Sequence, residues 1–370
     1  MPNAKSVISS MLEGTGITLG GTADHDIVIH NDAFYDRVLS GGTLAFGESY
    51  MDGWWDSKKL DEMITLMLQA DLDKKIEPWK MVIPVIKSYL LNYQNKTKAF
   101  EVGEKHYDIG NDLYKRMLDK RMVYTCGYWK NANNLDDAQE AKLDLICKKI
   151  GLKSGDHVLD IGCGWGSFAK FAAEKYGAKV TGVNNSKEQC VLANDQLKKF
   201  DIEIRVQDYR EITGQYDHIV SIGMFEHVGV KNYRTYMEVA QRSLKDGGFF
   251  LLHTIGGNRS VNRTNPWIDK YIFPNSMLPS AKQISASIEG LFVMEDWHNF
   301  GADYDKTLMA WHENFIQHWD EIKDQYNERF KRMWVFYLLT CAASFRSRKN
   351  QLWQIVLSKD GVPGGYTSIR

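Results

Sequence analysis

The feature that most constrains this chain is the stretch 158–166, which reads Val-Leu-Asp-Ile-Gly-Cys-Gly-Trp-Gly. An apolar run that ends in an acid and is followed by three glycines at alternate positions is typical of a buried strand that turns sharply into a helix. Glycine allows backbone conformations closed to other residues and lets a ligand lie directly on the main chain. The sequence therefore predicts a binding turn at Gly162, Gly164 and Gly166, with a packing turn that holds no ligand as the alternative.

The spacing of this turn narrows the choice of ligand. It is Asp-x-Gly-x-Gly-x-Gly, whereas dinucleotide folds use Gly-x-Gly-x-x-Gly with a later acid and phosphate loops use Gly-Lys-Ser/Thr. The acid inside the turn, Asp160, is badly placed for a pyrophosphate and well placed for a cationic amino group. The pattern resembles the S-adenosylmethionine loop of class I methyltransferases.

Strand and helix patterns alternate on both sides of this turn. Helices are expected from Ser167, Lys187 and Asn232. The expected strands are 156–161, 179–183, 203–206, 216–222, 248–253, 292–297 and 353–358. Such alternation predicts an α/β fold, a doubly wound and mostly parallel sheet with helices on both faces. Aromatic-rich helical segments at about 257–290 and 305–345 interrupt the sheet and are expected to form lid insertions over an apolar substrate.

The first part of the chain is interpreted as a smaller, mostly helical N-terminal domain. Its boundaries are 1–91, followed by a polar linker at 92–104 and a catalytic domain at 105–370. Short strands are expected at 17–19 and 26–29, then a helix that Gly41 and Gly42 interrupt. Aromatic residues gather in 44–55, either as the core of this domain or as a lipid-contacting surface. Apolar residues and lysines alternate between Lys74 and Lys98, which suits either an interfacial membrane contact or helix packing.

Composition excludes several classes of protein. The net charge is -1, so we expect no nucleic-acid partner held by bulk positive charge. The five cysteines show no metal-ligand spacing, which favours a reducing compartment and no structural metal. No apolar run reaches the length of a membrane span, so we expect a cytoplasmic protein that meets a membrane only at its surface.

Polar side chains at the ends of the second and third strands suit the nucleoside part of a cofactor. Asn184 and Gln189 follow the second strand and offer amide donors and acceptors for a ribose diol. Asp208 and Tyr209 follow the third, where an acid can accept from an exocyclic amine and an aromatic ring can stack on adenine. Helix capping or core packing is the alternative for all four.

A second polar set is expected at the ends of the fourth and fifth strands. Glu226 follows the fourth strand and His253 ends the fifth, while Tyr304 and Cys126 come from segments farther along and farther back in the chain. A carboxylate, an imidazole and a phenol converging on one apolar cleft could hold a small anion or act as a base.

The chain resembles a family of lipid-modifying enzymes, the cyclopropane-fatty-acyl-phospholipid synthases. The resemblance rests on Tyr-Thr-Cys-Gly-Tyr-Trp, Leu-Asp-Ile-Gly-Cys-Gly-Trp-Gly, Met-Phe-Glu-His-Val-Gly, His-Thr-Ile-Gly and Asn-Phe-Gly-Ala-Asp-Tyr, which begin at residues 124, 159, 224, 253 and 299. It covers nearly all of the second part of the chain, and the first part is similar to the family's N-terminal lipid-binding domain.

This resemblance implies a reaction, cofactors and partners. The reaction is methylene addition from S-adenosylmethionine across a cis double bond of a phospholipid acyl chain, at the inner face of a membrane, and a homodimer is allowed. Bicarbonate would be the proton acceptor, held by Cys126, Glu226, His253, Tyr304 and the backbone at Ile255. Tyr124 and Thr125 would help to cover the cofactor.

The resemblance leaves one residue and two other functions open. The family also has a cysteine at Cys341, but an alkene attacks the sulfonium methyl directly and needs no enzyme nucleophile, so this residue is either catalytic or a packing residue. An N- or O-methyltransferase of a small or lipid acceptor would share the glycine turn. A lipid-binding protein with an inactive transferase domain would be favoured only if Asp160 or the glycines were missing.

Overall fold

The computed structural model describes residues 4–72 and 110–370, and the expected linker and the lysine-rich segment 74–98 lie outside these residues. The chain forms two compact units, which are considered one at a time. Unit 2 contains most of residues 110–303 and the C-terminal stretch Gln351–Arg370. Unit 1 contains the N-terminal stretch together with Thr264–Pro274 and Tyr304–Asn350. Within the described ranges, no helix is both long and apolar enough to cross a bilayer.

Unit 2 is built on a seven-stranded sheet with the strand order β5-β4-β3-β6-β7-β9-β8. Its strands are β3 (His157–Ile161), β4 (Lys179–Asn184), β5 (Ile202–Val206), β6 (His218–Ile222), β7 (Phe249–Gly257), β8 (Val293–Asn299) and β9 (Asn350–Ser358). Pairing is parallel from β5 through β7, and β8 pairs antiparallel with β9. The expected doubly wound α/β sheet is confirmed, and each strand begins or ends within a few residues of its predicted position.

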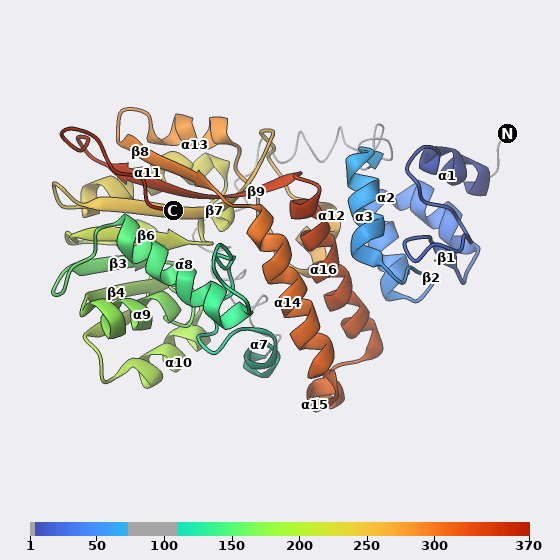
Figure 1. Ribbon diagram of the computed structural model, residues 1–370, viewed down its shortest axis with the longest axis horizontal. Coiled ribbons are helices and arrows are strands. Elements are labelled where there is room, and N and C mark those ends of the chain that lie inside the picture. The colour runs from blue at the N-terminus through green and yellow to red at the C-terminus, as the bar shows by residue number, and fades with distance from the viewer. Residues whose placement is uncertain (1–3, 73–109) are drawn as a thin grey trace. The chain divides into compact units, whose positions relative to one another are not determined.

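Helices cover both faces of this sheet (Figure 1). One face carries α8 (Leu135–Lys149), α9 (Ser167–Tyr176) and α10 (Lys187–Leu197), and the other carries α11 (Tyr233–Ser243) and α13 (Ala281–Ile288). The remaining elements of unit 2 are α7 (Asn111–Met117) and the short helices η1 (Tyr209–Glu211), η2 (Phe225–His227) and η3 (Val230–Asn232). Successive residues of a strand point to opposite faces of the sheet, and each face has its own hydrophobic core. Leu159 and Ile219 belong to one core, and Val158 and Val220 belong to the other.

Unit 1 is mostly helical. Its elements are α1 (Ala4–Leu12), β1 (Val28–Ile29), α2 (Ala33–Met51), β2 (Trp55–Asp56), α3 (Leu60–Gln69), α12 (Pro266–Tyr271), most of α14 (Ala302–Gln317), α15 (Trp319–Ile322), η4 (Lys323–Gln325) and α16 (Glu328–Arg346). In place of the expected strand at 17–19, the structure has an isolated β-bridge between Leu19 and Ile27. The expected break at Gly41 and Gly42 is instead a kink at Gly42 (φ 60°), after which α2 continues.

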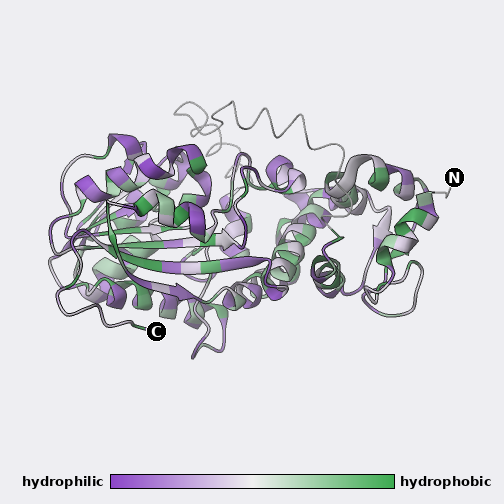
Figure 2. Ribbon diagram, turned by 90° about the horizontal axis from the view of Figure 1, so that it is seen from above, coloured by the Kyte–Doolittle hydropathy of each residue, from purple (hydrophilic) through white to green (hydrophobic). Residues whose placement is uncertain are grey.

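Phe46, Tyr50 and Trp55, three of the aromatic residues of 44–55, lie in the core of unit 1, while Trp54 is only partly buried. Phe46 stacks on Trp55 with a ring separation of 4.4 Å, and the ring of Phe336 from α16 lies 5.4 Å from Tyr50 and 4.8 Å from Trp267 of α12. All five rings are buried. The core interpretation therefore holds for these rings, and the helices around them mix hydrophobic and hydrophilic residues, as helices that cover a core do (Figure 2).

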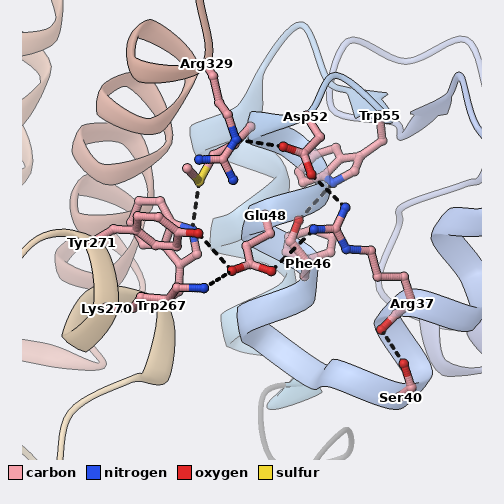
Figure 3. A network of polar contacts seen from close by, with 11 residues as sticks. Arg37, Ser40, Phe46, Glu48, Asp52, Trp55, Trp267, Lys270, Tyr271 and Arg329 are labelled. Atoms are coloured by element: carbon pink, nitrogen blue, oxygen red, sulfur yellow. Dashed lines mark hydrogen bonds and ion pairs between the residues drawn. The ribbon is translucent and has the colours of Figure 1, made fainter.

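Charged contacts also join segments of unit 1 that are far apart in the sequence. Glu48 accepts hydrogen bonds from Lys270 Nζ (2.6 Å) and Tyr271 Oη (2.8 Å), and Asp52 accepts from Arg37 and Arg329, both at 2.8 Å (Figure 3). Of the segments expected to form lids over the sheet, at about 257–290 and 305–345, the part Thr264–Pro274 and all of 305–345 share one compact unit with the N-terminal helices. The exception is α13, which packs against α11 in unit 2. The domain boundaries at 91 and 105 stay a prediction.

Candidate active site

The glycine turn after β3 has the geometry that the sequence predicts. Gly162, Gly164 and Gly166 have φ of 87°, 55° and 78°, in the left-handed region that favours glycine. A Cβ added at Gly164 would meet no atom within 4 Å, so a ligand can reach the main chain there. At Gly162 an added Cβ would lie 2.6 Å from Met224 Cβ, so this glycine also allows close packing. The turn leads directly into α9.

Asp160 precedes this turn and is almost completely buried. Its Oδ2 atom has no hydrogen-bond partner. Burial raises the pKa of its carboxyl to about 7, against the opposing charge of Lys142. A buried carboxylate oxygen without a partner is costly unless a ligand satisfies it, so Asp160 can receive the ammonium of a cofactor.

The residues expected to bind the ribose lie side by side at the end of β4. Asn184 Nδ2 donates to Gln189 Oε1 (2.7 Å), while Gln189 Nε2 is buried without a partner. The pair is therefore ordered by one internal bond and has an amide donor left over. This arrangement fits a site for hydroxyl groups, and the binding role stays a prediction.

The residues expected to bind adenine have structural roles as well. Asp208 caps η1 by accepting from Arg210 N (2.9 Å), and its Oδ2 atom pairs with the Arg210 guanidinium at 3.0 Å. Tyr209 is buried in the sheet core with its ring 5.0 Å from that of Tyr236. The capping and core interpretations are thus present in the structure, and the adenine contacts stay a prediction.

The segment that carries Tyr124, Thr125 and Cys126 lies against α8. Gln139 Nε2 donates to Thr125 O (2.7 Å), Lys142 Nζ donates to Thr125 Oγ1 (2.9 Å), and Tyr128 N donates to Ala138 O (2.8 Å). A Cβ on Gly127 would lie 2.9 Å from that of Ala138, so glycine is needed for this close approach. Cys126 is completely buried, and its thiol donates to Gly127 O (3.1 Å).

Sequence reasoning missed Gln139 and Lys142, and a signal for them was present. Buried residues of α8 lie at 135, 138, 139, 142, 143, 145, 146, 147 and 149, and those at helical spacing form the face of a helix that covers a core. Gln139, Lys142 and Lys149 occupy positions on this apolar stripe. Polar residues at core positions are rare unless they have partners, so they mark a site.

Glu226 and the backbone of Ile255, which the family resemblance places in one site, are in contact. Ile255 N donates to Glu226 Oε1 at 2.6 Å, while Glu226 Oε2 is buried without a partner. Burial raises the pKa of this carboxyl to about 7. At neutral pH Glu226 can therefore either accept or donate a proton.

His253 lies on β7 with one ring nitrogen available. Its Nδ1 atom is 3.3 Å from Gln354 Nε2 of β9, and with the amide donating, the imidazole proton resides on Nε2. The Nε2 atom is buried and has no partner. Burial and the charges of Lys142 and Lys149 hold the pKa of His253 well below its usual range, so the ring is neutral. His253 is therefore a neutral donor that lacks an acceptor.

Residues 299–303 of the motif at 299–304 belong to unit 2 and contact His253 and the segment that carries Tyr128 and Trp129. The ring of Phe300 lies 6.0 Å from that of His253 and 5.2 Å from that of Tyr128, and Asp303 Oδ2 accepts from Trp129 N (2.8 Å). Tyr304 and Cys341 belong to unit 1, where Tyr304 stacks on Phe345 at 4.5 Å. Their place in a site with Glu226 and His253 stays a prediction.

Comparison with known proteins identifies the family. Residues 94–355 match the mycolic acid cyclopropane synthetase family. The cyclopropane-fatty-acyl-phospholipid synthase of Escherichia coli K12 is 51% identical over 365 residues, which are 98% of this chain and 95% of that protein. This chain belongs to the mycolic acid cyclopropane synthetase family. It is therefore an enzyme of the S-adenosylmethionine-dependent methyltransferase class.

Solved structures agree with this assignment. The mycolic acid cyclopropane synthase CmaA1, solved in complex with SAH and CTAB, is 30% identical, has a TM-score of 0.65 and covers 70% of this chain and 98% of its own. Coclaurine N-methyltransferase has a TM-score of 0.71 and covers 85% of this chain and 99% of its own at 21% identity, which shows the class I methyltransferase fold alone.

Proposed function

We propose that this chain transfers a methylene group from S-adenosylmethionine across the cis double bond of unsaturated acyl chains in membrane phospholipids, forming cyclopropane fatty acids. The observation that carries the proposal is the pair of buried, partnerless atoms Glu226 Oε2 and His253 Nε2 in a chain of this family. The Escherichia coli relative, which is named for this activity, aligns over almost the whole chain. Because the substrate lies in a bilayer, we expect the enzyme to work at the inner membrane surface.

The chemistry requires a proton acceptor. One alkene carbon attacks the methyl carbon of the sulfonium, so that a carbon–carbon bond forms, the sulfur–methyl bond breaks and S-adenosylhomocysteine leaves. The other alkene carbon is left as a carbocation. Loss of a proton from the transferred methyl group then closes the ring. A nucleophilic side chain is needed at neither step, but a base near the methyl group is needed at the second.

The polar atoms at the ends of the strands match bicarbonate, which has one donor and several acceptors. His253 Nε2–H would donate to an anionic oxygen, and Glu226 Oε2 would accept from the hydroxyl. Cys126 and the backbone around Ile255 would complete the unit 2 part of this set. When bound, bicarbonate supplies the proton acceptor. Glu226, with a pKa of about 7, can accept the proton from the bicarbonate hydroxyl.

The decisive experiment is lipid mass spectrometry of cells that lack cyclopropane lipids and express this chain. We expect monounsaturated chains to gain the mass of one CH₂ group and then to resist mild catalytic hydrogenation. A gain on a headgroup amine or on a soluble acceptor would instead indicate an N- or O-methyltransferase. A mass gain on a chain that still takes up hydrogen would indicate methylation without ring closure.

Glu226→Gln tests the proton-acceptor role. This variant keeps the size of the side chain and the bond from Ile255 N, so we expect S-adenosylmethionine affinity to be retained. Turnover should fall about tenfold to a hundredfold, the effect of one lost hydrogen bond to a charged group, and added bicarbonate should restore part of it. Wild-type turnover that is insensitive to bicarbonate would remove Glu226 from the mechanism without touching the lipid assignment.

A further inference from the structure

The buried face of α8 holds Thr125 at two points. Gln139 Nε2 donates to the carbonyl oxygen of Thr125 (2.7 Å), and Lys142 Nζ donates to its hydroxyl oxygen (2.9 Å). The side chains of Gln139 and Lys142 are both fully buried. One turn of helix therefore fixes both the backbone and the side chain of Thr125.

The other side of Thr125 is fixed by packing. A Cβ added at Gly223, which follows β6 and has φ of 73°, would lie 2.6 Å from Thr125 Cγ2. The methyl group of Thr125 thus faces Gly223 while the hydroxyl oxygen faces Lys142. Since Lys142 donates to that oxygen, the hydrogen of the hydroxyl is directed away from Lys142 and can be donated to another acceptor.

Lys142 is a buried cation with acids near it. Alternation along β3 places Asp160 on the same face of the sheet as Val158, the face that α8 covers. Burial lowers the pKa of Lys142 to about 8, opposed by the charges of Asp119, Cys126 and Asp160, so the lysine is mainly protonated at neutral pH. The Asp119 carboxylate already accepts from the backbone nitrogens of Arg121 (2.9 Å) and Val123 (2.8 Å). A buried cation therefore faces a buried carboxylate, Asp160, that has an oxygen without a partner.

A buried cation and a buried acid on the same face of the sheet, each acting on the pKa of the other, are complementary to the end of an α-amino acid, in which an ammonium and a carboxylate share one carbon. We propose that Lys142, acting through the hydroxyl of Thr125, is the positive charge that holds the carboxylate of the methionine moiety of S-adenosylmethionine, while Asp160 holds the ammonium. Lys142 is thus a positioning residue for the cofactor. The inference rests on the proposed cofactor roles of Asp160 and Thr125.

The experiment compares two ligands that differ only in this carboxylate. Affinities for S-adenosylmethionine and for decarboxylated S-adenosylmethionine are measured by titration calorimetry on the full chain. Lys142→Met, which keeps the apolar stem and removes the charge, should weaken S-adenosylmethionine about tenfold to a hundredfold and leave the decarboxylated ligand within about threefold. Thr125→Val should show the same selectivity, and Thr125→Ser should restore wild-type behaviour.

The matched control is Lys149→Met. Lys149 is also a fully buried lysine of α8, but its Nζ lies 3.1 Å from His298 Nδ1 and 3.7 Å from Asp296. Removing its charge should leave the ratio of the two affinities unchanged. Asp160→Asn should weaken both ligands, because both keep the ammonium.

Three outcomes would overturn the inference. Equal weakening of both ligands by Lys142→Met would mean that the lysine only supports the fold, and no weakening would mean that the charge is not used. If Lys142→Met does not fold, a Thr125→Val protein that loses equal affinity for both ligands would also reject it. Failure of the wild-type chain to bind S-adenosylmethionine would instead refute the proposed function.

Discussion

Replacing Asp160 by asparagine should make the ligand-free protein more stable while it weakens cofactor binding. The carboxyl is buried, and burial raises its pKa from the ordinary 3.8 to about 7. The folded protein therefore holds a proton at Asp160 over a pH range in which the unfolded chain has released it. Between about pH 4 and pH 7 the stability of the wild-type protein should fall as pH rises, and the full cost of ionising the buried group is reached above pH 7.

The size of the effect follows from the two pKa values. A difference of about 3 pH units, at about 1.4 kcal/mol for each, gives about 4 kcal/mol as the upper range of the penalty at pH 8. Asparagine has the shape of the protonated acid and no charge. Asp160→Asn should therefore match the wild type near pH 4 and exceed its free energy of unfolding by a few kcal/mol at pH 8.

Urea unfolding of ligand-free protein at pH 4, 6 and 8 measures this difference directly. Asp195→Asn is the control, because Asp195 is exposed and its hydrogen bond from Lys198 lowers its pKa, so no gain with rising pH is expected. A variant Asp160→Asn that is equally stable or less stable at pH 8 would refute the argument. It would show that the Asp160 carboxylate stays in contact with water, although the structure buries it.

Three further predictions concern unit 1. Burial raises the pKa of Cys341 to about 12, so the thiol is not ionised at neutral pH. Cys341→Ser should therefore keep turnover within about threefold of wild type in a vesicle assay. A loss of a hundredfold or more would give this cysteine a catalytic role. Phe336→Ala should cost about 3 to 5 kcal/mol in urea unfolding, because its buried ring packs among the aromatic side chains of α2 and α12, and a cost below about 1 kcal/mol would contradict that packing. Burial raises the pKa of Glu48, but hydrogen bonds from Lys270 and Tyr271 outweigh burial, so the pKa of this carboxyl is lowered. Glu48→Gln should therefore reduce the thermal midpoint of unfolding at pH 7, and the reduction should disappear as the pH falls below about 4. An equal reduction at both pH values would mean that the charge of Glu48 plays no part.

Local patterns in the sequence predicted the sheet of unit 2 and three of its helices. The acid and glycines after β3, and the polar residues that follow the other parallel strands, could be placed at one edge of the sheet because parallel strands end at one edge. Lys142 and Gln139 were missed because α8 reads as an ordinary amphipathic helix, with charged residues all along it. In the sequence of a helix, a buried lysine can be told from an exposed one only by its spacing from the apolar residues that form the buried face.

Which segments of the chain make up unit 1 could not be predicted in the same way. Nothing in the local sequence of α16 specifies that Phe336 packs on Phe46, Trp55 and Trp267, because such contacts depend on how distant segments meet. The same contacts change the interpretation of a truncation. Removing residues 1–100 would expose the apolar face of α16, so loss of activity in that protein would not by itself assign lipid binding to the N-terminal segment.

The three-part composition of unit 1 also bears on how the chain is made. A ribosome releases α2 and α3 before the strands of the sheet, but their packing partner α16 (Glu328–Arg346) is synthesised only after β8. The sheet strands from β3 to β8 are released before then. Because domains generally fold as units during synthesis, most of unit 2 can begin to form while the aromatic side chains of α2 are still uncovered. The helices α2 and α3 therefore wait for α16 while the intervening strands are made, and during that interval their apolar side chains stay open to other contacts.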